Sequence, residues 1–121
     1  MRREQKVVLV VDDEALIRMN TVEMVEEAGF LAIEARDAEA AIEILTERDD
    51  IAIMLTDVTM PGRMDGLKLA AFVEQTWPSI RIILASGLRI VRDRELPRAS
   101  RFLPKPYTSR QISDALRELA G

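Results

Sequence analysis

The sequence contains no cysteine and no histidine among its 121 residues. Without cysteine the chain has no disulfide framework, no thiol nucleophile and no thiolate metal site. Without histidine it lacks the most common general base and the most common transition-metal ligand. Any chemistry must therefore use carboxylates, hydroxyls or lysine, and any metal ion is expected to be one that prefers oxygen ligands.

Long apolar runs are also missing. No stretch approaches the roughly 18 apolar residues that a membrane span requires. The N-terminal residues 1–6 are charged and lack the apolar region of a signal peptide, so we expect a cytoplasmic chain with no membrane contact. The formal net charge is −4, and this disfavours direct binding to nucleic acid because phosphates repel an acidic surface.

The length of the chain corresponds to one domain, residues 1–121, and 48% of its residues are hydrophobic. Apolar runs without polar alternation are typical of strands buried on both faces of a sheet. Such runs occupy residues 6–11, 30–35, 51–56, 80–85 and 101–103. Helical periodicity follows at residues 15–28, after the caps Asp37 and Asp65, and after Thr108, which forms a capping box with Gln111.

This regular alternation of strands and helices predicts an α/β fold with a parallel sheet and helices on both faces. The pattern alone does not fix the strand order. Residues 88–100 allow one or two helical turns at most, because Pro97 interrupts them. For the helix after Asp65, the expected inner face consists of Leu69, Val73, Thr76 and Trp77.

Polar side chains follow four of the predicted strands. They are Asp12, Asp13 and Glu14, then Asp57, Ser86 and Lys105. Taken singly, each has an ordinary explanation as a turn, cap or solvated loop residue. In a parallel sheet, however, all of them meet at one edge, where clustered carboxylates require protonation or a cation. A carboxylate cluster with Mg²⁺, a hydroxyl and a lysine is suited to a phosphoryl group, and a carboxylate can itself accept it.

Five motifs together carry a family resemblance. They are VVDDE (10–14), LTDVTMPG (55–62), MDG (64–66), ASG (85–87) and FLPKP (102–106). In order and spacing, the whole chain resembles the receiver domain of two-component response regulators, of the single-domain, CheY-like type. The resemblance implies a flavodoxin-like three-layer α/β/α sandwich whose five-stranded parallel sheet has the order 2-1-3-4-5.

The resemblance also implies a role for each site residue. Asp57 matches the phospho-acceptor, and Asp12, Asp13, Asp57 and the backbone carbonyl of Thr59 match the protein ligands of Mg²⁺. Lys105 matches the lysine that pairs first with the acceptor and then with the phosphoryl group. Ser86 and Phe102 match the hydroxyl and the aromatic residue of the family's switch, although Phe102 is equally compatible with a plain core position. The Lys105–Pro106 bond resembles the family's cis peptide.

The sequence departs from the family pattern in three places. The loop after Asp57 is one residue longer, and an excursion around Arg63 is expected. Only 18 residues separate Ser86 from Lys105, fewer than is typical, so the fourth helix of the family is expected to be shortened or irregular. Phe102 has no hydroxyl, which removes the hydrogen bond of a switch tyrosine.

The segment from Ser86 to Lys105 is basic, with six basic side chains against two acidic ones and a net charge of +4. Such runs are usually solvated surface. The more specific interpretation is a docking surface for an acidic protein, so that a downstream target binds the face formed by residues 86–121.

The expected function is a phosphorylation-controlled signalling switch that is not itself an enzyme, beyond assisting its own phosphorylation and dephosphorylation. Its partners are a histidine kinase or a histidine phosphotransfer protein, and its output is protein contact or phosphoryl relay. Two alternatives remain open: a phosphorylation-independent interaction module, and the receiver of a larger hybrid kinase or regulator. A nucleotide binder fits poorly, because Asp12, Asp13 and Glu14 repel phosphate at the first turn. An aspartate-based phosphatase also fits poorly, because Glu14 and not Asp13 would have to supply the carboxylate two positions after its nucleophile.

Overall fold

The computed structural model describes residues 5–60, 64–87 and 100–120. Five strands form one parallel sheet in the order β2-β1-β3-β4-β5. They are β1 (Val7–Val11), β2 (Leu31–Ala35), β3 (Ile51–Asp57), β4 (Arg81–Ser86) and β5 (Ser100–Pro104). The parallel sheet and the order 2-1-3-4-5 are therefore confirmed.

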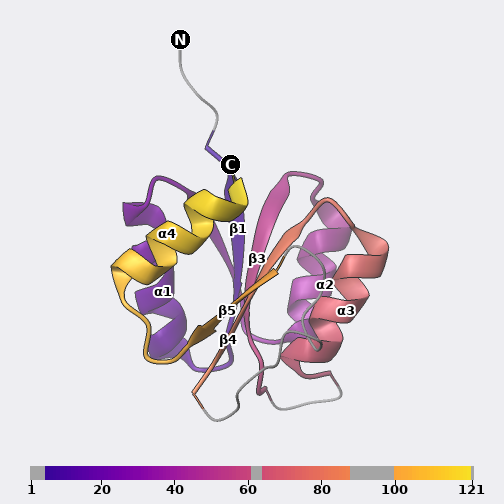
Figure 1. The fold of residues 1–121 in the computed structure, drawn as a ribbon. Helices are drawn as coiled ribbons and strands as arrows, with labels where there is room; N and C mark the ends of the chain where they lie inside the picture. Colours follow the sequence, from indigo (N-terminus) through magenta and orange to yellow (C-terminus); the bar gives the residue numbers. More distant parts are fainter. Residues whose placement is uncertain (1–4, 61–63, 88–99, 121) are drawn as a thin grey trace.

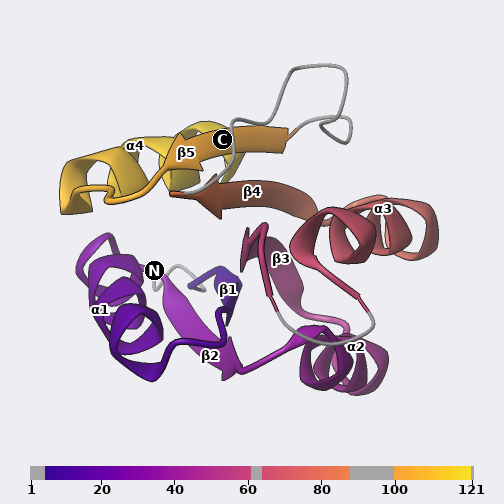
Figure 2. The ribbon, with the colours of Figure 1, turned by 90° about the horizontal axis from the view of Figure 1, so that it is seen from below.

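Four helices cover the sheet in the described part of the chain. They are α1 (Ala15–Glu27), α2 (Ala38–Glu47), α3 (Gly66–Thr76) and α4 (Ser109–Ala120). Helices α1 and α4 lie on one face, and α2 and α3 on the other (Figures 1 and 2). Each face buries its own apolar cluster against the sheet, so the strands are apolar on both sides, as in other parallel sheets. No described helix is long and apolar enough to cross a bilayer.

The helix starts follow from local side-chain chemistry. Asp37 accepts a hydrogen bond from the Ala40 amide at 2.8 Å, and Asp65 accepts one from the Lys68 amide at 2.9 Å. Before α4, the Gln111 amide donates to the Thr108 hydroxyl oxygen at 3.1 Å, and the Thr108 amide donates to the Gln111 side chain at 2.8 Å. The predicted capping box is thus confirmed.

The predicted inner face of α3 is wrong at one position. Thr76 is exposed, and the buried residues are Gly66, Leu69, Ala70 and Val73. Thr76 is the last residue of α3, and only its side chain faces solvent among the four predicted residues, because Val73 is fully buried and Trp77 packs against the cluster beneath α2 and α3. The shortened fourth helix predicted within residues 88–100 and the excursion around Arg63 lie outside the described residues.

Strand β3 contains one irregularity far from its C-terminal end. Val7 of β1 pairs with Ile51, but Val8 pairs with Ile53, so the register shifts at Ala52. Ala52 and Ile53 consequently both belong to the cluster beneath α1 and α4, whereas Ile51 belongs to the other cluster. Regular alternation from Ile53 onward then places Asp57 on the α1 side of the sheet.

Candidate functional site

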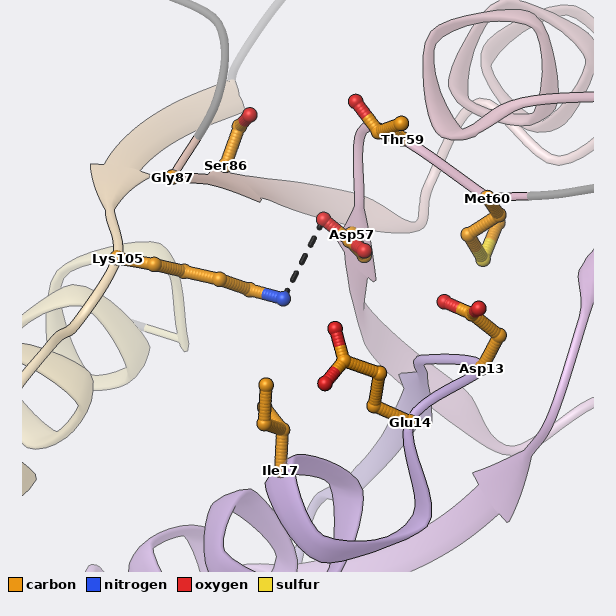
Figure 3. A pocket seen from close by; sticks show the side chains of 9 residues that line it. All are labelled: Asp13, Glu14, Ile17, Asp57, Thr59, Met60, Ser86, Gly87 and Lys105. Atoms are coloured by element: carbon orange, nitrogen blue, oxygen red, sulfur yellow. Dashed lines mark ion pairs between the residues drawn. The ribbon is translucent and has the colours of Figure 1, made fainter.

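The carboxyl ends of the strands enclose a cavity of about 400 Å³ (Figure 3). Its lining comes from the ends of β1, β3, β4 and β5 and from the start of α1. The lining residues are Asp13, Glu14, Ile17, Asp57, Thr59, Met60, Ser86, Gly87 and Lys105. The position agrees with the general rule that ligands of open α/β sheets bind beyond the carboxyl ends of the strands.

Three carboxylates meet at this edge. Asp12 follows β1 and Asp57 ends β3, with 3% and 7% of their surface exposed, while Asp13 is exposed. One oxygen from each of these three residues lies within 4.8 Å of the other two. Oxygen donors at this spacing fit a hard divalent cation that keeps part of its water shell, so the donor set is compatible with Mg²⁺.

Lys105 bridges two of the acids. Its ammonium donates to Asp12 Oδ2 at 2.9 Å and lies 3.4 Å from Asp57 Oδ1, an ion pair drawn in Figure 3. Its backbone amide donates to the Ser86 carbonyl oxygen at 3.0 Å. The Lys105–Pro106 peptide is cis, as the family resemblance implied. A positive charge is therefore held against the two buried carboxylates.

The pKa values of these groups reflect their burial and proximity. Burial raises the pKa of the Asp57 carboxyl above its ordinary value; Lys105 opposes this rise, and the charge of Asp12 adds to it. Burial lowers the pKa of the Lys105 ammonium, but its hydrogen bond to Asp12 and the two nearby carboxylates outweigh burial and raise it overall. Lys105 is consequently a permanent cation at neutral pH.

Hydrogen bonds to its carboxylate and its backbone fix the orientation of Asp12. Its Oδ1 accepts the Glu14 amide at 2.9 Å, and its own amide donates to the Ala35 carbonyl at 3.1 Å. Arg18 donates to the Asp12 carbonyl oxygen at 2.8 Å and to the Glu34 carboxylate at 2.9 Å. Sequence reasoning missed Arg18, whose only sequence signal is its place on the first helix, one turn after the acids.

The backbone of Asp57 is in close contact with the first residue of α3. The Gly66 amide donates to the Val58 carbonyl at 2.8 Å, and the Val58 amide donates to the Ala85 carbonyl at 2.9 Å. A Cβ atom on Gly66 would lie 1.8 Å from the Asp57 carbonyl oxygen. Only glycine fits at this position, so Gly66 sets how closely α3 approaches the end of β3.

The remaining predicted residues have different positions. Ser86 is 3% exposed and lines the cavity opposite Thr59. Thr59 is exposed and lines the rim of the cavity. Phe102 is half-buried and packs against the cluster beneath α2 and α3. The structure thus brings Ser86 and Thr59 to the cavity and places Phe102 in the adjoining core.

Fold and site together define a class of protein: a doubly wound α/β domain with a buried carboxylate, an acid cluster and a lysine at the carboxyl edge of its parallel sheet. A family model for the response regulator receiver domain matches residues 8–117. The chain belongs to this family, whose members act in phosphorylation-dependent signalling.

Two curated relatives come from Brucella abortus (strain 2308). The chain is 28% identical to the response regulator receiver protein CpdR, over 94% of this chain and 96% of that protein. It is 34% identical to part of the sensor kinase CckA, over 93% of this chain but only 12% of the kinase. The chain therefore spans nearly all of one relative and about an eighth of the other.

Solved structures agree with this assignment. A response regulator receiver protein from Pseudomonas putida superposes with a TM-score of 0.85 at 26% identity, covering 97% of this chain and 99% of that chain. The receiver domain of the hybrid histidine kinase CckA superposes with a TM-score of 0.81 at 25% identity, covering 95% and 99%.

Proposed function

We propose that Asp57 accepts a phosphoryl group from the phosphohistidine of a histidine kinase or a histidine phosphotransfer protein. The observation that carries this proposal is the ion pair between Asp57 and Lys105 beside the acids Asp12 and Asp13. The proposed cofactor is Mg²⁺, held by Asp12, Asp13, Asp57 and the carbonyl of Thr59. The proposed location is the cytoplasm, where such donors are formed from ATP.

In the proposed reaction, a carboxylate oxygen of Asp57 attacks the phosphorus atom. The bond from phosphorus to the imidazole nitrogen of the donor breaks, and its electron pair stays on that nitrogen. Lys105 balances the charge on the phosphoryl oxygens, and the Ser86 hydroxyl donates to one of them. A bound divalent cation supplies further charge neutralisation and orients the phosphoryl group. The domain is a phospho-acceptor, and we propose no turnover of other substrates.

The test is phosphoryl uptake from a small donor. Incubation with acetyl phosphate and Mg²⁺ is expected to add the mass of one phosphoryl group, and peptide mapping after borohydride reduction should locate it at Asp57. Chelation of Mg²⁺ with EDTA should abolish uptake, because the carboxylate cluster repels the anionic donor when no cation is bound.

The Asp57→Asn variant is the control for the attachment site and should gain no mass. A wild-type chain that stays unmodified with Mg²⁺ present would contradict the proposal. That result would favour the phosphorylation-independent interaction module.

The second candidate is the receiver of a larger hybrid kinase or regulator. The observation in its favour is the 34% identity to a segment that makes up only 12% of a sensor kinase. The chemistry at Asp57 is the same in both candidates. Neighbouring sequence in the gene distinguishes them, because a hybrid protein would encode kinase or output domains in the same reading frame.

For the output, we propose that a downstream acidic protein docks on the chain between residues 86 and 121, of which residues 88–99 lie outside the part that the structure describes. The support is the net charge of +4 between Ser86 and Lys105 in a chain of net charge −4. Reversing Arg92 and Arg94 to glutamate is expected to slow association by about tenfold at low salt and less at high salt. Stopped-flow binding over a salt series measures this, and unchanged association kinetics would rule the surface out.

A further inference from the structure

A hydrogen bond between two hydroxyl groups joins α1 to the segment that follows Lys105. The oxygens of Thr21 and Tyr107 lie 2.5 Å apart, although the residues are 86 positions apart in the chain. Thr21 is 1% exposed, and its hydroxyl donates its single proton to the Ile17 carbonyl oxygen at 2.9 Å. Tyr107 is therefore the donor and Thr21 the acceptor of the short bond.

This bond lies in the wall of a second cavity, of about 350 Å³, between α1 and the segment after β5. Its lining residues are Ile17, Asn20, Thr21, Met24, Lys105, Pro106 and Tyr107. The segment after β5 and α1 thus face each other across this cavity. The Tyr107 ring packs against the core beneath α1 and α4, and its hydroxyl reaches the helix.

Tyr107 is separated from Lys105 by a single residue, Pro106, whose ring fixes its backbone φ angle. On the other side, the Lys105 amide is bonded to the Ser86 carbonyl of β4 at 3.0 Å. The chain around Lys105 is therefore bonded to the sheet through the lysine's own amide and to α1 through the side chain of Tyr107. The same helix begins directly after Asp12 and Asp13, so the second of these bonds connects the chain around the lysine to the element that follows the acids.

We propose that the hydrogen bond between Tyr107 and Thr21 positions the Lys105 ammonium between Asp12 and Asp57 for phosphoryl transfer. Tyr107 and Thr21 are positioning residues, since they act through Lys105 and not on the phosphoryl group. The inference rests on the proposed function and adds a contact that controls the rate of phosphoryl uptake at Asp57.

Tyr107→Phe and Thr21→Val each keep the shape of the side chain and remove one partner of the bond. Each is expected to lower the rate constant of uptake from acetyl phosphate by roughly threefold to tenfold at saturating Mg²⁺, the range for a lost neutral hydrogen bond. The dissociation constant for Mg²⁺, measured by titration calorimetry, is expected to change much less than in Lys105→Met, since the ammonium is displaced but not removed and the acids keep their places. Thr21→Ser restores the acceptor and should recover the wild-type rate.

The chain offers a matched control in α2. Thr46 donates to the Ile42 carbonyl at 2.7 Å, the same bond within a helix that Thr21 makes to Ile17, but at an exposed position away from the cavity. Thr46→Val should therefore leave the uptake rate unchanged. Thermal unfolding of every variant separates a loss of folded protein from a loss of rate.

The decisive measurement repeats Tyr107→Phe in a Lys105→Met background. If Tyr107 acts through Lys105, the second substitution has no further effect on the rate there. The same threefold to tenfold loss in that background would overturn the proposal, as would a wild-type rate in both single variants. These outcomes leave the function of Asp57 standing, whereas the absence of uptake by the wild-type chain would remove that function and this inference with it.

Discussion

Replacing Lys105 by methionine is expected to slow phosphoryl uptake at Asp57 by on the order of 100-fold, the effect of removing one preorganised group that stabilises developing charge. The Lys105 ammonium lies 2.9 Å from Asp12 and 3.4 Å from Asp57. Methionine keeps most of the side-chain volume but leaves the phosphoryl oxygens without this positive charge. The rate constant is measured from intact mass against time with acetyl phosphate at saturating Mg²⁺.

The same substitution slows phosphoryl uptake but should increase the affinity for Mg²⁺. Because the ammonium competes with a cation for the two carboxylates, its removal should tighten Mg²⁺ binding. Without Mg²⁺, the fold should lose about 3 kcal/mol, since breaking a buried pair leaves carboxylates uncompensated. Lys68→Met, at an exposed position on α3, is the control and should change none of these quantities. Wild-type uptake and unchanged Mg²⁺ affinity in Lys105→Met would contradict the role given to this lysine.

Replacing Gly66 by alanine is expected to lower the free energy of unfolding by about 3 kcal/mol, at the upper end of the usual cost of overpacking. The added Cβ would lie 1.8 Å from the Asp57 carbonyl oxygen and 2.8 Å from the Val58 Cα. Both atoms belong to the backbone and cannot rotate away, so either α3 or the end of β3 must move. Urea denaturation measures the loss, and the remaining folded protein should take up phosphoryl groups more slowly because Asp57 is displaced.

Gly87 provides the matched comparison. A Cβ there would lie 3.4 Å from the Lys105 Cβ, an ordinary contact, so Gly87→Ala should cost much less stability than Gly66→Ala. Equal unfolding free energies for the two variants would show that the contact between α3 and β3 relaxes easily.

Much of the fold could be predicted from the sequence, because parallel strands leave a strong local signal. The run that ends at Asp57 is apolar at successive positions, and the caps Asp37 and Asp65 mark the helices that begin after them. Thr76 was misplaced because its helical spacing from Val73 is that of an inner position, whereas the structure exposes it at the last residue of α3. The strand order came from the family resemblance, since apolar patterning carries no information about which strands are neighbours.

The meeting of Asp12, Asp57 and Lys105 could also be predicted, because residues that follow parallel strands share an edge. The contacts that support these three residues could not be predicted. Gly66 reads in the sequence as an ordinary helix start after a cap, and its closeness to Asp57 depends on how α3 packs. The bond from Tyr107 to Thr21 joins residues 86 positions apart, a distance at which periodicity and capping rules predict nothing.

The register shift at Ala52 has a consequence for changes in chain length. Counted from Ile51 without the shift, alternation would point Asp57 toward α2 and α3, away from Lys105. Both faces of β3 are apolar, so hydrophobic burial alone would not oppose that inverted arrangement. Deleting or inserting one residue between Ile53 and Asp57 would thus turn the carboxylate to the wrong face of an otherwise well-buried strand. Length changes at Ala52 itself fall before the regular pairing that starts at Ile53, so they are expected to leave Asp57 on the side of Lys105.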